Sequence, residues 1–365
     1  MSTPPRIGDL LRERRIIVCC GAGGVGKTTT AAALSLAAAR AGRRVLVLTI
    51  DPSRRLAETL GVSRNPPEPV PMPAERQAAA NIHAPALLEA WMLDAKLVAD
   101  NTIRRLTRSP EEAEKVIANR IYQQVSSMLA GMQEYTAMEA LYRLSRSDKY
   151  DLIVLDTPPS RHVLDFLDAP RRLSRLVDTK AMAAFLPKAD SIVTRAASKV
   201  IQAILRGVFG EEFATEFVAF VGTFAGILSA ANLDVNEMRK VLSSADVAFL
   251  LVTSPQPATL TEAHFFQEKT RELALPFRGF VLNRSRALNQ SKALPDSAMF
   301  AGTAIDKLQA LARVELELAG RDVALLHDLQ TRAGSEATAI ALPELVEGAD
   351  DMTTLIAIAD VLARS

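Results

Sequence analysis

Cysteine is scarce in this chain, and its two cysteines, Cys19 and Cys20, are adjacent in one apolar run. Neighbours on a strand point to opposite faces, so these two thiols cannot bind one metal ion together. The sequence has no C-x-x-C motif. The cysteine content excludes a disulfide framework and fits a reducing cytoplasm. We therefore interpret both cysteines as buried, inert thiols.

The chain also lacks an excess of charge of either sign. It has 43 lysines and arginines and 42 aspartates and glutamates, which gives a net charge of +1. This charge gives no overall attraction to nucleic acid, and we predict no nucleic-acid partner. The first 15 residues lack the apolar core of a signal peptide. With 48% apolar and 23% charged residues, the chain is expected to be a globular cytoplasmic protein with at most transient membrane association.

Long apolar runs are rare, and the longest uncharged stretch, residues 217–233, has 17 residues. This length is at the bottom of the transmembrane range, and the stretch contains polar residues and glycines. We interpret it as a helix for a protein interior or a groove. Just before it, residues 192–208 place apolar side chains at i, i+3 and i+4 spacing beside basic ones. These helices either line a groove or pack on the protein's own core.

The order of the elements predicts an α/β fold. Residues 14–20 form an apolar, β-branched run, residues 27–42 are alanine-rich, and residues 43–51 form the next apolar run. This strand–helix–strand unit predicts a parallel sheet. Further strands are expected at residues 87–93, 150–156, 246–253, 277–283 and 337–342. Residues 63–77 carry five prolines and are expected to form an exposed loop without a core of its own.

The resulting prediction is one doubly wound, mostly parallel domain over residues 1–365. Helical patterns at 95–147 and 171–243 lack strand signals, so we expect a helical subdomain inserted into that domain.

The stretch from Gly21 to Thr28, GAGGVGKT, fits the phosphate-loop pattern G-x-x-x-x-G-K-[ST] completely, with a strand before it and a helix after it. Glycines let backbone N–H groups turn toward phosphate oxygens, and the helix N-terminus adds partial positive charge. Lys27 is expected to reach the β- and γ-phosphates of a nucleotide, and the Thr28 hydroxyl is expected to bind Mg²⁺. The residues assigned to phosphate binding are Gly23, Gly24, Val25, Gly26, Lys27, Thr28 and Thr29.

Two aspartates follow strands at the edge of the sheet where ligands bind in such folds. Asp156 ends the strand LIVLD and is expected to hold Mg²⁺ through water. Asp51 ends RVLVLTID; it is expected to orient or deprotonate the attacking water and is counted among the metal ligands. Each aspartate would also suit the cap of the following helix. Neither late strand leads into N-K-x-D, which favours adenine over guanine.

These motifs resemble those of the ArsA-like ATPases, which include arsenite-pump ATPases and ATPases that target tail-anchored membrane proteins. GAGGVGKTT resembles the family's phosphate loop, of the deviant-Walker (MinD/ArsA-like) class. LTIDPSRRL resembles its first switch and LDTPPSRHVLDFL its second, which matches Asp51, Asp156 and His162 to family positions. The resemblance implies that Asn283, in VLNRS, contacts adenine and that Pro343, in ALPELVEG, lies in a loop that covers the base. It also implies ATP and Mg²⁺ as cofactors.

The chain departs from the family at Ala22, where the family has a signature lysine that reaches the other subunit's nucleotide. Three candidates remain for a cation that replaces this lysine: Arg161, the pair Arg54 and Arg55, or a lysine from a partner subunit. The metalloid-binding cysteines and the zinc C-x-x-C of the two named branches are missing as well. The sequence is most similar to a bacterial branch described as ArsA-like or anion-transporting ATPases. A homodimer, or a heterodimer with a lysine-bearing paralogue, is expected.

These motifs and departures are compatible with three candidate functions. The leading hypothesis is an ATP-hydrolysing dimeric switch that binds an apolar client, such as a segment of a membrane protein. The alternative is the energising subunit of a membrane anion pump. A filament or positioning ATPase of the septum-site type is disfavoured, because the C-terminal TTLIAIADVLARS has few basic residues for a membrane-targeting helix.

Overall fold

The computed structural model describes residues 5–49, 55–63, 66, 68–107, 109–120, 122–123, 132–157, 240–288, 303–344 and 352–365, with a few single positions between 206 and 237. Its elements, in chain order, are α1 (Ile7–Glu13), β1 (Ile16–Gly21), α2 (Lys27–Arg40), β2 (Arg44–Thr49), α3 (Arg55–Leu60), β3 (Val70–Pro71), α4 (Ala74–Ala79), β4 (Leu87–Met92), α5 (Ala95–Leu106), α6 (Pro110–Ala118), α8 (Met132–Ser145), β5 (Leu152–Asp156), β6 (Val247–Thr253), α13 (Pro257–Glu272), β7 (Phe277–Ser285), α14 (Thr303–Ala333), β8 (Thr338–Pro343) and α15 (Met352–Arg364).

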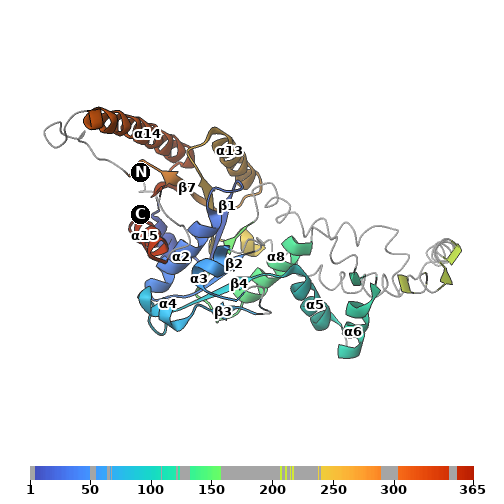
Figure 1. Ribbon diagram of the computed structural model, residues 1–365. Coiled ribbons are helices and arrows are strands. Elements are labelled where there is room, and N and C mark those ends of the chain that lie inside the picture. The colour runs from blue at the N-terminus through green and yellow to red at the C-terminus, as the bar shows by residue number, and fades with distance from the viewer. Residues whose placement is uncertain are drawn as a thin grey trace. The chain divides into compact units, whose positions relative to one another are not determined.

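The strands of the described residues form one sheet in the order β3-β4-β2-β5-β1-β6-β7-β8. Figure 1 labels β1, β2, β3, β4 and β7 of this sheet. Every neighbouring pair is parallel except β3 and β4, which are antiparallel. β1 lies between β5 and β6, so the chain turns to opposite sides of β1, and its carboxyl end is a topological switch point. The prediction of a doubly wound, mostly parallel α/β fold is confirmed.

One face of the sheet is covered by α2 and α15, which pack against each other (Figure 1). Helix α2 is built largely from alanine, with Ala31, Ala32 and Ala33 fully buried. Such small side chains let the helix approach the buried strand β1 closely.

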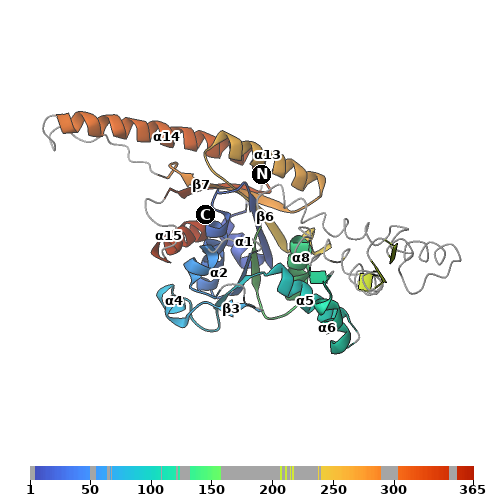
Figure 2. The ribbon, with the colours of Figure 1, turned by 45° about the vertical axis from the view of Figure 1, so that its right-hand side comes forward.

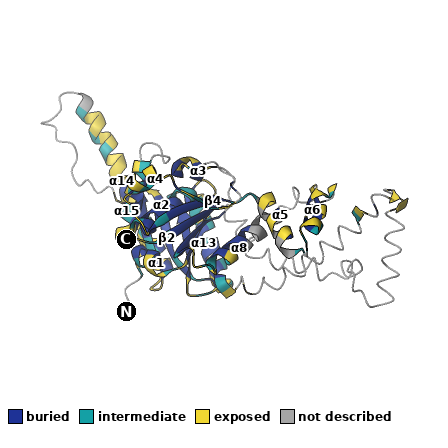
Figure 3. Cartoon of the chain, turned by 90° about the horizontal axis from the view of Figure 1, so that it is seen from below, coloured by how far each residue is buried: buried dark blue, intermediate teal, exposed yellow. Residues whose placement is uncertain are grey.

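Helices α13 and α14 lie side by side on the other face (Figures 1 and 2). The Gln267 side-chain amide on α13 donates to the carbonyl of Arg332 on α14 at 2.9 Å. α14 has 31 residues, and its first half runs beyond the sheet (Figure 2). There it exposes Leu308, Leu311 and Val314, and this part of the helix is mainly yellow in Figure 3.

The proline-rich loop, residues 63–77, differs from its prediction. It contains β3, which pairs with β4, and it buries the Met72 side chain to 1% exposure. The indole N–H of Trp91 donates to the Pro66 carbonyl at 3.0 Å. The expectation of an exposed, extended loop was wrong here, because the segment contains β3 and the start of α4 and its Met72 packs into the core of the main sheet.

The chain divides into two compact units, residues 1–92, 145–163 and 242–365 in the first and residues 93–144 and 164–241 in the second. In the second unit, Asp94 caps α5 by accepting the backbone N–H groups of Lys96 and Leu97. Buried Asp100 accepts the Tyr122 hydroxyl at 2.6 Å. The segments 192–208 and 217–233, for which we expect a client groove or core packing, lie almost entirely outside the described residues. None of the described helices has the length and apolar character needed to cross a membrane.

Candidate functional site

The glycine-rich loop over residues 21–26 joins the carboxyl end of β1 to the amino end of α2. Gly24 and Gly26 have φ angles of +76° and +92°, in the left-handed region that favours glycine. Within the described part of the chain, no atom outside residues 23–25 lies within 4 Å of the place where a Cβ on Gly24 would stand. The loop backbone at Gly24 therefore has room for an anion, as the phosphate-loop motif predicts.

Lys27 begins α2 and is 6% exposed. Its ammonium donates a hydrogen bond to the Ala22 carbonyl at 2.8 Å. The side chain therefore folds back along the loop instead of extending into solvent. A buried ammonium needs hydrogen-bonding or anionic partners, so the loop holds a cation beside its own open backbone.

Asp156 ends β5 and is fully buried. One of its carboxylate oxygens accepts the Thr28 hydroxyl at 2.7 Å and the Thr49 hydroxyl at 3.0 Å. Thr28 comes from α2 and Thr49 from the end of β2, so three elements converge on one oxygen. Hydroxyl and carboxylate oxygens are the donors that Mg²⁺ prefers. The residues present therefore fit a magnesium–nucleotide complex.

Thr49 was missed in the sequence, although it stands in the strand RVLVLT, two residues before Asp51. Because β2 and β5 are parallel neighbours with Thr49 opposite Asp156, the carboxyl ends of both strands meet at one edge. The parallel register of these two strands was the signal that could have identified it.

Asn283 and Pro343 lie at the same edge of the sheet, near the ends of β7 and β8. Asn283 is 8% exposed, and its side-chain amide donates to the Val25 carbonyl in the phosphate loop at 2.8 Å. The sequence predicted a base contact for Asn283 but not this bond to the loop. Pro343 is half-buried and pairs with Ser285.

The structure buries Ala22 to 6% exposure, in the same core cluster as Val25. The position of the expected signature lysine is thus an apolar one in this chain. Asp51, Arg54, Arg161 and His162 lie outside the described residues, as does the side chain of Arg55.

Both cysteines are free and buried beneath the loop, in β1. Burial, reinforced by the charge of Asp156, raises the pKa of Cys19 well above its ordinary value. Burial raises the pKa of Cys20 to about 12. Because the thiolate is the reactive form, neither cysteine supplies a nucleophile or a metal ligand near neutral pH. The interpretation as buried, inert thiols is consistent with this geometry.

The parallel sheet, the complete phosphate loop at its switch point and the carboxylate opposite the loop threonine define a P-loop nucleotide-binding fold. A model of the anion-transporting ATPase family, the ArsA ATPases, matches residues 14–293. The chain belongs to this family, and the expected membership of the ArsA-like group is confirmed.

The individual relatives share only a low sequence identity with this chain. An uncharacterised protein of Streptomyces coelicolor, SCO2128, is 28% identical over 77% of this chain and 63% of its own length. The ATPase GET3 of Malassezia globosa is 25% identical over 47% of this chain and 48% of its own length. A putative arsenical pump-driving ATPase of Halobacterium salinarum is 28% identical over 44% of this chain and 24% of its own length. The chain thus spans less than two thirds of each of these relatives.

Proposed function

We propose that this protein is a Mg·ATP-dependent ATPase that acts as a dimeric nucleotide switch and binds an apolar client. The observation that carries the proposal is the 2.7 Å bond between the Thr28 hydroxyl and the buried carboxylate of Asp156, beside the Lys27 ammonium on the phosphate loop. A hydroxyl, a carboxylate and a lysine around one open helix N-terminus form the set of groups that a magnesium-bound triphosphate requires.

Each side chain has a separate role in this proposal. Lys27 and the backbone N–H groups of the loop bind the phosphates, while Thr28 and Asp156 hold the metal ion. Thr49 orients the Asp156 carboxylate through its 3.0 Å hydrogen bond. Asp51 takes the proton of the attacking water. Bound Mg²⁺ supplies charge neutralisation along the phosphate chain.

Adenine is the proposed base. Neither β6 nor β7 leads into N-K-x-D, the pattern that would favour guanine. Asn283 and Pro343, at the ends of neighbouring strands, are the proposed contacts of the base. ATP is therefore expected to bind more tightly than GTP.

The proposals of a dimer and of an apolar client are based on family membership and on the sequence. Ala22 removes a cation that the resemblance places at a dimer interface, so the partner is proposed to be a second copy or a lysine-bearing paralogue. The client is proposed to bind residues 192–233, whose apolar and uncharged patterns suit a hydrophobic helix.

A second candidate is the energising subunit of a membrane anion pump. The description of the family as anion-transporting ATPases and the name of the Halobacterium relative favour it. Trapping the protein with a non-hydrolysable ATP analogue before purification separates the two candidates. A switch with a client is expected to retain hydrophobic segments, whereas a pump subunit is expected to retain an integral membrane channel.

Nucleotide binding tests the common part of both candidates. Wild-type protein with Mg²⁺ should bind a fluorescent ATP analogue, and ATP should displace it at a concentration at least about tenfold below that of GTP. Lys27→Ala should weaken binding by about 100-fold or more, because a buried, charged hydrogen-bond donor is lost. Lys307→Ala, at an exposed position of α14, is the matched control. Equal binding by wild type and Lys27→Ala would remove the basis of the proposal.

A further inference from the structure

The side chain of Asn283 is placed against the phosphate loop rather than toward solvent. Its amide nitrogen donates to the Val25 carbonyl at 2.8 Å, across 258 residues of sequence. A Cβ atom added to Gly26 would come within 2.2 Å of the same nitrogen. The amide therefore lies directly on the backbone of Gly26, and glycine is the residue that permits this approach.

A β-bulge in β7 produces this placement. Leu282 pairs with Ala341 and Ser285 pairs with Pro343, so β7 has one more residue than β8 between the two pairs. Arg284, inside the bulge, has a φ of +55°, which is uncommon for a residue other than glycine. Bulges of this kind redirect a neighbouring side chain, and they occur often next to functional sites.

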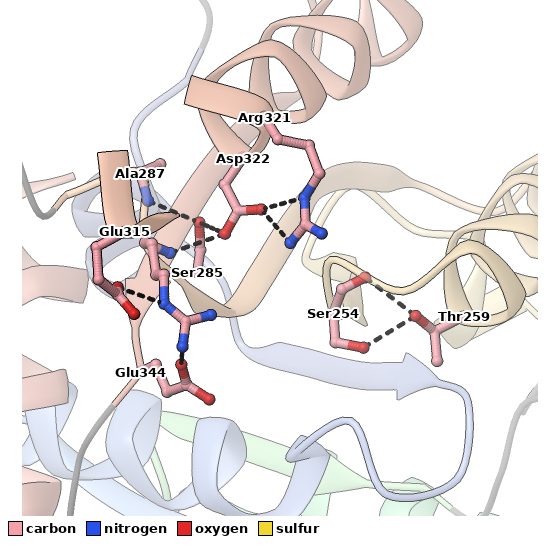
Figure 4. Close-up of polar contacts among 9 residues, drawn as sticks. Ser254, Thr259, Ser285, Ala287, Glu315, Arg321, Asp322 and Glu344 are labelled. Atoms are coloured by element: carbon pink, nitrogen blue, oxygen red, sulfur yellow. Dashed lines mark hydrogen bonds and ion pairs between the residues drawn. The ribbon is translucent and has the colours of Figure 1, made fainter. Parts of the chain in front are cut away.

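Asp322, in the middle of α14, fixes the far side of the bulge (Figure 4). It is fully buried, and its carboxylate accepts the Arg286 backbone N–H at 2.8 Å. The Ser285 hydroxyl donates to the same oxygen at 3.4 Å. Arg321 donates to the other oxygen at 2.9 Å. A buried carboxylate with these donors holds the backbone after Asn283 in one conformation.

The Arg286 guanidinium adds a second attachment. It pairs with Glu315 of α14 and with Glu344, which follows β8, each at 2.8 Å. The Glu344 backbone N–H also donates to the Ser285 carbonyl at 3.3 Å. The bulge is thus tied to α14 on one side and to the end of β8 on the other.

From these contacts, we propose that Asn283 is a positioning residue for the phosphate loop and that α14, through Asp322, holds Asn283 in place. This inference rests on the proposed function, because it assumes that the loop binds a nucleotide. It goes beyond the base contact expected of Asn283. An amide offers two N–H donors and one acceptor, so the bond to Val25 is compatible with a base contact by the same side chain.

The physical effect is pre-organisation of the loop. Glycines lose more conformational freedom on ordering than other residues, and this loop has glycines at 21, 23, 24 and 26. A tether at Val25 restricts the loop before a ligand arrives, so less ordering entropy is lost when phosphates bind.

Hydrogen–deuterium exchange of the nucleotide-free, full-length protein tests this directly. In Asn283→Ala and in Asn283→Asp, which keeps the size but removes the donor, amides of residues 21–28 should exchange about 3- to 10-fold faster than in wild type. Peptides from β2 and β4 serve as the internal control for global stability. Acceleration in the loop that does not exceed the acceleration in these strands would overturn the proposal.

Asp322→Asn tests the anchoring role of α14, since it keeps the shape but removes the carboxylate charge. Loop exchange should rise in this variant as well, whereas Arg313→Gln, at an exposed position of α14 outside this network, should leave it near the wild-type rate. Unchanged loop exchange in Asp322→Asn would refute the anchor. No nucleotide enters these measurements, so failure of ATP binding by wild type would refute the proposed function separately from this inference.

Discussion

The Thr28 hydroxyl donates to the Asp156 carboxylate at 2.7 Å although 128 residues separate the two in the chain. The first belongs to the helix after the phosphate loop and the second to the end of a neighbouring strand of the same sheet. This pair is the part of the proposed site that binds metal, and it is the basis of the first prediction.

Asp156→Asn should raise the Mg²⁺ concentration needed for half-maximal ATPase activity by about 10- to 100-fold. The amide keeps an acceptor for the hydroxyls of Thr28 and Thr49 but loses the negative charge that attracts the ion. Asp151→Asn is the matched control, because Asp151 precedes the same strand and pairs with Arg44 at 2.7 Å. A titration in which both variants shift equally, or in which neither shifts, would contradict the assignment.

Ala22→Lys should accelerate ATP hydrolysis about tenfold or more if two copies place their nucleotides face to face, because a cation at the transferred phosphoryl group stabilises the transition state. The Ala22 site is buried, but a lysine stem can extend to carry its ammonium outward. Ala22→Met has a similar length without charge and should stay slow. Unchanged turnover in Ala22→Lys, together with monomeric behaviour in ATP, would favour a lysine-bearing partner instead.

Phe220→Asp and Ile227→Asp separate a client groove from a core helix, at positions outside the described residues. In a groove, both changes should leave the melting temperature nearly unchanged and weaken client capture. In a core, each would bury an unpaired carboxylate and lower the melting temperature sharply. Phe266→Asp, at a fully buried position of α13, is the reference that shows how far the melting temperature falls when a core position is changed. Matching losses in all three variants would refute the groove.

The stability of the protein should fall between pH 7.5 and pH 5.5, in part through His264 on α13. Burial, followed by the charge of Arg332, lowers the pKa of His264 below its ordinary 6.5. Within the described residues, its buried Nε2 atom has no hydrogen-bond partner. Below pH 6.5 the unfolded chain takes up a proton that the folded chain resists, so stability decreases as the pH falls.

His264→Gln should flatten this part of the pH profile, measured as urea midpoints at several pH values. His327→Gln, at an exposed position of α14, should keep the slope of the wild type. A slope that survives in His264→Gln would show that other groups cause it.

Much of the fold could be predicted because the signals are local. Buried parallel strands require continuous apolar runs, and β5 and β6 appear in the sequence as LIVLD and VAFLLVT. The phosphate loop is equally local, since eight consecutive residues specify it. These features need no knowledge of distant contacts.

The features that escaped prediction depend on tertiary structure. The bond from Thr49 to Asp156 follows from strand register, and the bond from Asn283 to Val25 follows from a bulge opposite β8. Helix α14 received no prediction: Gly320 weakens the helical signal of its sequence, and its first half carries apolar side chains that the fold leaves exposed. Buried Asp322 links this helix to Ser285 and Arg286, which lie 37 and 36 residues away in the sequence.

The most direct test of the proposed ATPase compares binding and chemistry in Asp51→Asn. Wild-type protein should hydrolyse ATP only with Mg²⁺. Asp51→Asn should bind Mg·ATP within a few-fold of wild type, because the phosphate cradle is intact. Its single-turnover hydrolysis should fall by about 10²- to 10⁴-fold, because the attacking water loses its base. Hydrolysis by Asp51→Asn at the wild-type rate would contradict the account.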